Sequence, residues 1–121
     1  MKRLASLLAL ALVIAVPALA GDWAMRTGDA PLSGADLDAV LGAPAVRFYD
    51  GGRSEYGPGS AYAYVYSSED RAEGRYRIEA DGSVCVDFVN GFSRCDLYVR
   101  NGGRVLLLDE KGDRYPLMPG E

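Results

Sequence analysis

From residue 61 onward, apolar and polar positions alternate along the chain in short runs. The runs cover residues 61–66, 75–79, 83–89, 92–100, 104–109 and 114–118. A period of two is typical of strands that bury one face, and Asp-Gly or Asn-Gly between such runs favours tight hairpins. Connections this short leave no room for crossover helices, so the strands are predicted to pair antiparallel.

The residues upstream of this region predict a short helix and one further strand. Ser33 is a favourable N-cap residue, and Leu37 and Leu41 fall on one helical face, so a helix is expected over 33–41. A strand at 46–49 follows the helix. Two polar or glycine-rich stretches are interpreted as loops, 53–60 and 67–73.

These elements predict a mainly β fold. The expected architecture is an antiparallel meander of six to seven strands that forms a small barrel or half-barrel, with one short N-terminal helix packed on it. The helix has about two turns and is too short to be stable alone, so it must bury its apolar face against the sheet. The predicted organisation is a single β-rich domain over 33–121, preceded by an irregular lead-in over 21–32.

The hairpin at 75–89 has one register that both strands support. A three-residue turn with a left-handed Gly82 places Ile78 opposite Val84 and Tyr76 opposite Val86. Apolar side chains then meet apolar side chains across the two strands, which stabilises the pairing. We therefore predict this register.

The next hairpin carries both cysteines and allows two registers. A three-residue turn places Cys85 directly opposite Cys95 but puts Val86 opposite Arg94. A two-residue turn pairs Val86 with Cys95 instead and leaves the cysteines on opposite faces. An even pair of cysteines favours a structural disulfide in an oxidising compartment. We expect the disulfide register, with a β-bulge near 88–94 that relieves the conflict between Val86 and Arg94.

Residues 1–20 have the composition of a secretory signal peptide. Lys2 and Arg3 precede an apolar run over 4–16, and 18–20 form a small-x-small cleavage site. The apolar run is too short to span a bilayer, so no membrane insertion is expected once the segment is removed. The predicted location is the periplasm or the exterior of the cell.

The 121-residue chain contains no histidine and carries a formal net charge of −4. Removal of the signal peptide would change this charge to −6, because the segment contains Lys2, Arg3 and no acidic residue. The missing imidazole excludes His-dependent nucleophilic catalysis and His-ligated zinc. An acidic protein is repelled by phosphate backbones, so no nucleic-acid partner is expected.

The acidic residues offer no alternative chemistry. The adjacent carboxylates at 69–70 and 109–110 lie in predicted turns, whereas glycosidases need two carboxyl groups across a cleft. Lys111 stands where a calcium loop would need a ligand, and the glycines match no phosphate-binding pattern. We therefore predict no enzyme activity, no cofactor and no metal site.

Tyrosine is the residue type with the most functional promise. Tyr62, Tyr64 and Tyr66 occupy alternate positions of one predicted strand and share a face, and Tyr56 lies in the preceding predicted loop. A tyrosine ring with its polar tip suits protein interfaces and sugar-stacking surfaces. If the row faces solvent, these four residues are candidate binding residues. If the row faces inward, it is a layer of the barrel core.

A family resemblance is carried by turn motifs and by the cysteines. The matching segments are 32–37, 74–76, 81–88, 94–95 and 112–117. On these residues the chain resembles a family of small exported bacterial β-rich proteins of unknown function that share a two-cysteine C-terminal hairpin. The resemblance implies a related β fold, and it carries no enzyme activity or cofactor to this chain.

These observations predict a non-catalytic secreted or periplasmic binding or inhibitor module that engages an envelope protein or glycan. A monomer is expected. The alternative is a structural or stress-related envelope protein with no small-molecule site.

Overall fold

The computed structural model describes residues 23–120, so the predicted signal peptide at 1–20 lies outside the described residues. All strands of the described region belong to one antiparallel sheet, in which β2 to β9 are neighbours in chain order and β1 pairs with β7 beside this path. The elements are β1 (Ala30–Pro31), α1 (Gly34–Leu41), β2 (Val46–Arg47), β3 (Arg53–Tyr56), a 3-10 turn η1 (Pro58–Ser60), β4 (Ala61–Val65), β5 (Arg71–Ile78), β6 (Val84–Phe88), β7 (Ser93–Asn101), β8 (Arg104–Asp109) and β9 (Arg114–Pro116).

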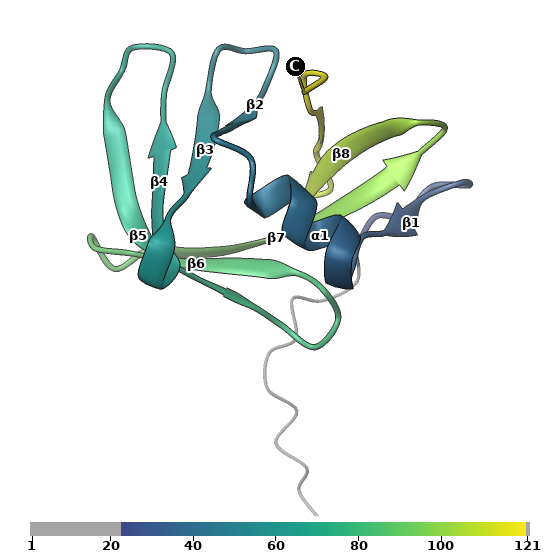
Figure 1. Cartoon of the computed structure of the whole chain (residues 1–121), viewed down its shortest axis with the longest axis horizontal. Helices are drawn as coiled ribbons and strands as arrows, with labels where there is room; N and C mark the ends of the chain where they lie inside the picture. Colours follow the sequence, from purple (N-terminus) through teal and green to yellow (C-terminus); the bar gives the residue numbers. More distant parts are fainter. Residues whose placement is uncertain (1–22, 121) are drawn as a thin grey trace, which may run out of the picture.

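The sheet curls into a half-barrel, which confirms the predicted fold class. Figure 1 shows β3, β4 and β5 on one side of the concavity and β8 on the other, with α1 lying between them. The two ends of the sheet meet where Phe48 forms an isolated antiparallel bridge with Leu117. Beside it, the Met118 N–H donates to the Arg47 carbonyl oxygen at 2.8 Å. The curl therefore brings β2 and β9 together at one point.

Strand β3 corrects the prediction of a loop over 53–60. Ser54 is buried and faces the concavity, whereas Arg53 and Glu55 form a partly exposed ion pair of 3.2 Å on the outer face. Polar residues therefore occupy both faces of this strand. The hydrophobic alternation that identifies other strands is absent, so the pattern did not reveal it.

Strand β5 begins inside the predicted connection 67–73 and corrects that boundary. Its first two inner positions carry small residues because they lie opposite large rings: Ala72 pairs with Tyr64 and Gly74 with Tyr62. An alternation of charged and small residues resembles a polar loop in sequence. Tertiary context, rather than residue type, makes this segment a strand.

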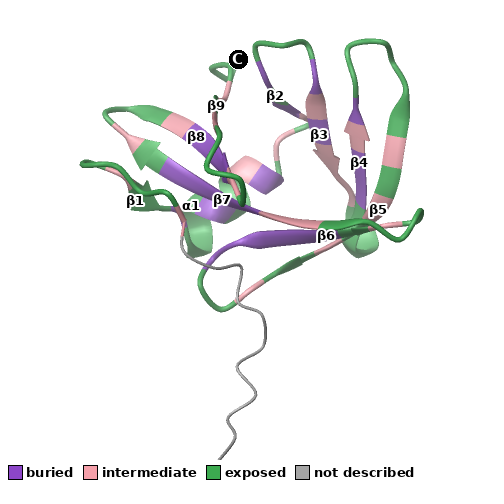
Figure 2. Ribbon diagram, turned by 180° about the vertical axis from the view of Figure 1, so that it is seen from behind, coloured by how far each residue is buried: buried purple, intermediate pink, exposed green. Residues whose placement is uncertain are grey.

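Two apolar clusters lie on the two faces of the sheet. The inner cluster joins α1 to the concave face through buried side chains, which are Leu32, Leu37, Leu41, Val46, Phe48, Val84, Tyr98 and Leu107. The outer cluster contains Leu97, Val99, Leu106 and Leu108, with Trp23 packed against it. In Figure 2 the buried residues are concentrated in β6, β7 and β8, while the turns are exposed. The helix predicted over 33–41 is thus confirmed, with Ser33 at its N-cap position.

The segment before α1 is held to the sheet by a buried ion pair. Asp29 accepts two hydrogen bonds from Arg114 at 2.8 Å each, and another from Asn101 at 2.8 Å. The Arg114 guanidinium holds the pKa of the Asp29 carboxyl well below its ordinary range. The described part of the lead-in predicted as irregular over 21–32, residues 23–32, therefore follows a defined path and contributes the short β1.

The first hairpin has the predicted register. Ile78 lies opposite Val84 and Tyr76 opposite Val86, and Gly82 has a φ of 86°. A left-handed backbone at the last turn position is favourable for glycine because no Cβ meets the carbonyl oxygen.

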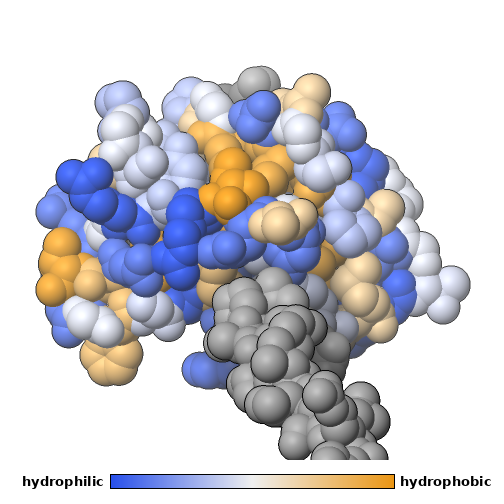
Figure 3. Space-filling model, turned by 90° about the horizontal axis from the view of Figure 1, so that it is seen from below, coloured by the Kyte–Doolittle hydropathy of each residue, from blue (hydrophilic) through white to orange (hydrophobic). Residues whose placement is uncertain are grey.

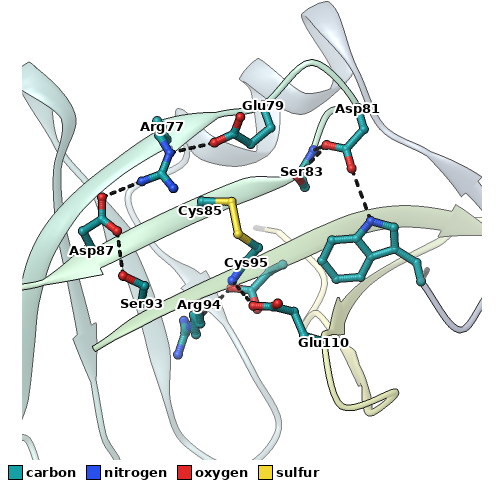
Figure 4. Close-up of a disulfide and its surroundings, with 12 residues drawn as sticks. Arg77, Glu79, Asp81, Ser83, Cys85, Asp87, Ser93, Arg94, Cys95 and Glu110 are labelled. Carbon is teal, nitrogen blue, oxygen red and sulfur yellow. Dashed lines mark hydrogen bonds and ion pairs between the residues drawn. A yellow bond between two sulfur atoms is a disulfide. The ribbon is translucent and has the colours of Figure 1, made fainter. Parts of the chain in front are cut away.

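The second hairpin has the disulfide register, with a Cys85–Cys95 Cα distance of 4.0 Å. The predicted bulge near 88–94 is wrong, because pairing continues without interruption through Val86 opposite Arg94. Figure 4 shows why no bulge is needed: Arg94 points away from the disulfide, towards the other face of the sheet. Chain-entropy arguments assign a disulfide that closes so short a loop about 2–3 kcal/mol of stabilisation.

The outer face of β5 and β6 is strongly polar. Figure 3 shows a band of hydrophilic side chains across this side of the molecule. Arg77 forms ion pairs with Glu79 and Asp87, and Asp87 accepts a hydrogen bond from Ser93 at 2.7 Å. All of these side chains are exposed, and exposed ion pairs contribute little to stability. This face is therefore a solvated surface of the half-barrel.

Candidate functional site

The tyrosine row of β4 runs from the core to the surface. Tyr62 is 3% exposed, Tyr64 is half-buried and Tyr66 is 50% exposed. The rings of Tyr62 and Tyr64 project from the concave face, since they occupy alternate positions of β4, and Tyr66, the residue after the strand, packs against Tyr64 with ring centroids 4.9 Å apart. Neither of the two expectations, a row that faces solvent or a layer of the core, describes all three tyrosines. The first member of the row is a core residue and its last is open to solvent.

Tyr56 joins the buried end of this row. It pairs with Tyr62 across β3 and β4, with ring centroids 5.1 Å apart, and its hydroxyl lies 2.6 Å from that of Tyr98. Burial raises the pKa of Tyr62 to about 12 and that of Tyr56 further. Both hydroxyls are neutral at physiological pH. Of the four candidate tyrosines, Tyr56 and Tyr62 therefore support the site from beneath, and Tyr64 and Tyr66 line it.

Arg94 is the central residue of the site, and the sequence reasoning did not identify it. Its Nη2 donates to the Tyr62 hydroxyl at 2.6 Å, and its Nε donates to Asp96 Oδ2 at 3.1 Å. The guanidinium carbon also lies 5.4 Å from the ring centroid of Tyr64 and 5.5 Å from that of Phe88. Hydrogen bonds and cation–π contacts together hold Arg94 in one orientation.

The register of the cysteine hairpin could have identified both charged residues. With Cys85 opposite Cys95, positions 94 and 96 necessarily share the face of Val86 and point into the concavity. The predicted bulge rested on the assumption that an arginine facing the concavity opposite Val86 would have no partner. The structure supplies that partner two residues along the same strand, Asp96.

The Arg94–Asp96 pair is buried unequally. The side chain of Asp96 is 2% exposed and that of Arg94 is 36% exposed. Burial raises the pKa of Asp96 to about 6, against the opposing effect of the neighbouring Arg94 charge. Arg94 Nη1 and Asp96 Oδ1 form no hydrogen bond with any residue from 23 to 120, and no fully buried side-chain N or O atom in this range lacks a partner. These two atoms are therefore accessible to solvent or to a ligand.

A cavity of about 210 Å³ opens above this pair, and we call it the inner tyrosine pocket. Its principal lining residues are Tyr64, Tyr66, Tyr115, Arg94, Asp50 and Asp109. Burial raises the pKa of the Tyr115 hydroxyl, and the negative charge of Asp109 adds to the rise. The pocket therefore combines aromatic walls with one cation at its base and carboxylates near its rim.

Close approach of the backbone sets the position of Tyr64. A Cβ atom at Gly52 would overlap the Tyr64 hydroxyl. The Gly52 N–H in turn donates to Asp50 Oδ1 at 2.8 Å, which orders the turn between β2 and β3. Glycine at this position thus leaves space for the tyrosine ring that forms one wall of the pocket.

Asp96 lines the inner tyrosine pocket and is held there in an ion pair. Its carboxyl accepts a hydrogen bond from Arg94, and the carboxyl groups of Asp50 and Asp109 line the same cavity. Within residues 23–120, no three acidic or cysteine side chains are grouped so that they could hold a metal ion. No helix of the same region is long and apolar enough to cross a membrane.

Asp96 should make the stability of the protein depend on pH between about 5 and 7. The folded pKa of Asp96, about 6, exceeds its ordinary value of 3.8. The protonated carboxyl therefore stabilises the folded state fully below pH 4, and this stabilisation is lost as the pH rises through 6. The free energy of unfolding should therefore fall by roughly 1 kcal/mol from pH 5 to pH 7. Urea unfolding across this range measures the change.

The absence of histidine makes this measurement specific, since no side chain of the chain has an ordinary pKa between 5 and 7. Asp96→Asn should flatten the profile over this range. Asp29, whose pKa is lowered, acts only under more acidic conditions. An identical slope in the wild type and in Asp96→Asn would contradict the assignment.

Comparison of the chain with known protein families, curated proteins and solved structures found no match.

Proposed function

We propose that this protein is a non-catalytic binding or inhibitor module that engages an envelope protein or glycan through the inner tyrosine pocket. The observation that carries the proposal is the half-barrel opening, where tyrosine rings and a fixed arginine remain accessible. Tyr66 and Tyr115 are 50% and 38% exposed at this opening, and such amphipathic rings are enriched in binding hot spots. The pocket is smaller than the roughly 300–1,000 Å³ of typical drug-sized ligand sites, so it fits a single ring or side chain.

The proposed location is the periplasm or the exterior of the cell. The Cys85–Cys95 disulfide is compatible with an oxidising compartment, where such bonds form and persist. The apolar segment at 4–16 has the properties of an export signal. We also propose that the protein acts as a monomer and belongs with the small exported β-rich proteins that its cysteine hairpin resembles.

Affinity capture tests this function. The immobilised protein should retain one saturable component from an envelope extract or from purified peptidoglycan. Tyr66→Ala and Tyr115→Ala should each reduce this retention about tenfold, because the loss of an interfacial aromatic ring often costs more than about 1 kcal/mol of binding energy. Both side chains are partly exposed at the rim, so these variants should fold normally.

A matched control is the exposed aromatic ring of Phe92, which lies 73% exposed in the turn between β6 and β7, away from the pocket. Phe92→Ala should retain the component as the wild type does. The proposal is rejected if the immobilised protein retains neither a component of the envelope extract nor peptidoglycan. That result favours a structural or stress-related protein. The proposal is also rejected if Tyr66→Ala, Tyr115→Ala and Phe92→Ala all retain the component to the same extent.

A further inference from the structure

A second, larger cavity lies at the helix end of the half-barrel. It has a volume of about 500 Å³ and lies between α1, the residues around β2, the turn from β7 to β8 and the segment after β9. It shares no lining residue with the inner tyrosine pocket. We call it the arginine groove, and the residues that matter for its chemistry are Val40, Val105, Leu117, Arg47, Arg100 and Arg104.

The base of the groove is apolar. Val40, Val105 and Leu117 pack against the inner core cluster on one side and remain half-buried on the groove side. Met118, which lines the same cavity, is 42% exposed. A ligand that covered these side chains would remove apolar surface from water, which favours binding.

The rim of the groove is cationic, in contrast to the protein as a whole. Arg47, Arg100 and Arg104 all line it, and Asp36 is the only acidic lining residue among the described residues. The chain carries a formal net charge of −4, so a site with three arginines and one aspartate is locally reversed in sign. This charge favours an anionic ligand group.

These three arginines are also available for binding. Five other arginine side chains of the sheet are paired with carboxylates, namely those of Arg53, Arg71, Arg77, Arg94 and Arg114, and Arg75 donates to the Gly59 carbonyl oxygen. By contrast, Arg47, Arg100 and Arg104 form no ion pair and no side-chain hydrogen bond with any residue of the described region. A guanidinium group can therefore engage a carboxylate here without breaking an existing contact.

We propose that the arginine groove binds a single-chain amphipathic anion, an alkyl carboxylate. The alkyl chain covers Val40, Val105 and Leu117, and the carboxylate lies at the arginine-bearing rim. The volume of about 500 Å³ falls within the roughly 300–1,000 Å³ of typical small-ligand sites. The proposal is independent of the function assigned to the inner tyrosine pocket, because the two cavities share no lining residue.

Titration of the full chain with octanoate and decanoate below their micelle concentrations tests the ligand class. Decanoate should shift the amide NMR signals of Val40, Val105 and Leu117 in a saturable manner. Each added methylene should lower the Kd by up to about fourfold, the equivalent of about 0.8 kcal/mol per buried CH₂. Decyltrimethylammonium, which has a similar chain and the opposite charge, should produce no saturable shift at these residues.

Charge removal tests the role of the rim. Arg100→Gln combined with Arg104→Gln should weaken decanoate binding about tenfold or more, as expected for the loss of charged hydrogen bonds. Arg26→Gln is the matched control, because Arg26 is exposed, forms no ion pair with a described residue and does not line the groove. Three results would each overturn the proposal. Decyltrimethylammonium could bind as tightly as decanoate, decanoate could produce no saturable shift, or Arg26→Gln could weaken decanoate binding as much as the double variant does.

Discussion

Replacement of Gly74 by alanine is expected to destabilise the protein by at least about 3 kcal/mol or to prevent folding. A Cβ atom at this position would overlap the carbonyl oxygen of Asp87, and it would also lie 3.0 Å from the Cα atom of Phe88. Both atoms belong to the backbone of β6, so no side-chain rotation can relieve the overlap. The change therefore exceeds the roughly 1–3 kcal/mol typical of overpacking against flexible side chains. Urea unfolding monitored by circular dichroism measures it.

Gly57 provides a matched control for this substitution. A Cβ atom at Gly57 would lie 3.6 Å from that of Ala61, which is ordinary van der Waals contact, and its φ of −105° is accessible to alanine. Gly57→Ala should therefore change the free energy of unfolding by no more than about 0.5 kcal/mol. Similar unfolding midpoints for Gly74→Ala and the wild type would show that β5 and β6 do not approach as closely as described.

Replacement of Arg94 by methionine is expected to destabilise the protein by about 3 kcal/mol at pH 7 to 8. The substitution leaves the buried Asp96 carboxyl without its cationic partner, and interruption of a buried pair typically costs about 3–5 kcal/mol. The lower end applies because the Arg94 side chain is itself 36% exposed, so solvent screens part of its charge. The free energy of unfolding from urea titration gives the magnitude.

The effect of Arg94→Met should decrease on acidification. At pH 5, Asp96 binds a proton in the folded state and no longer needs the guanidinium, because its pKa of about 6 lies above that pH. Arg100→Met is the matched control, since Arg100 lies on the same strand, is exposed and forms no ion pair with a described residue. It should change the stability by about 0.5 kcal/mol or less. A loss for Arg94→Met that is independent of pH would contradict the coupling to Asp96.

The two substitutions address different requirements of the inner tyrosine pocket. Gly74 allows β5 to pass close to β6 and leaves space opposite Tyr62. Arg94 joins Tyr62 to Asp96 at the base of the cavity. Gly74→Ala therefore tests how closely β5 and β6 approach each other. Arg94→Met tests how the buried charge of Asp96 is balanced.

The strand pattern was readable where apolar residues alternate and turns are marked by glycine. Strand β8 follows the predicted run over 104–109, and the first hairpin has the register derived from Gly82. The pattern failed at β3 and at the start of β5, where small or polar residues face large rings. These positions are strand because of what lies opposite them, and no local property encodes that.

The residues of the candidate site were predictable only in part. Tyrosine composition drew attention to residues 62–66, although it could not show that Tyr62 is buried while Tyr66 is exposed. Arg94 and Asp96 were overlooked, because an inward-facing charge is expected only when its partner is known. The sequence pattern did not predict the arginine groove either. Arg47 is far from Arg100 and Arg104 along the chain, and the three line one cavity only after the sheet curls.

Short turns and alternating polarity are local properties, so the mainly β class, the antiparallel pairing and the first hairpin register could all be derived from the order of residues alone. Composition alone also excluded histidine chemistry. The folded arrangement was needed to establish which side of the sheet is concave, which tyrosines reach the surface and where each unpaired charge lies. These features depend on contacts between distant residues, whose free energies are set by burial and by neighbouring charges rather than by residue type.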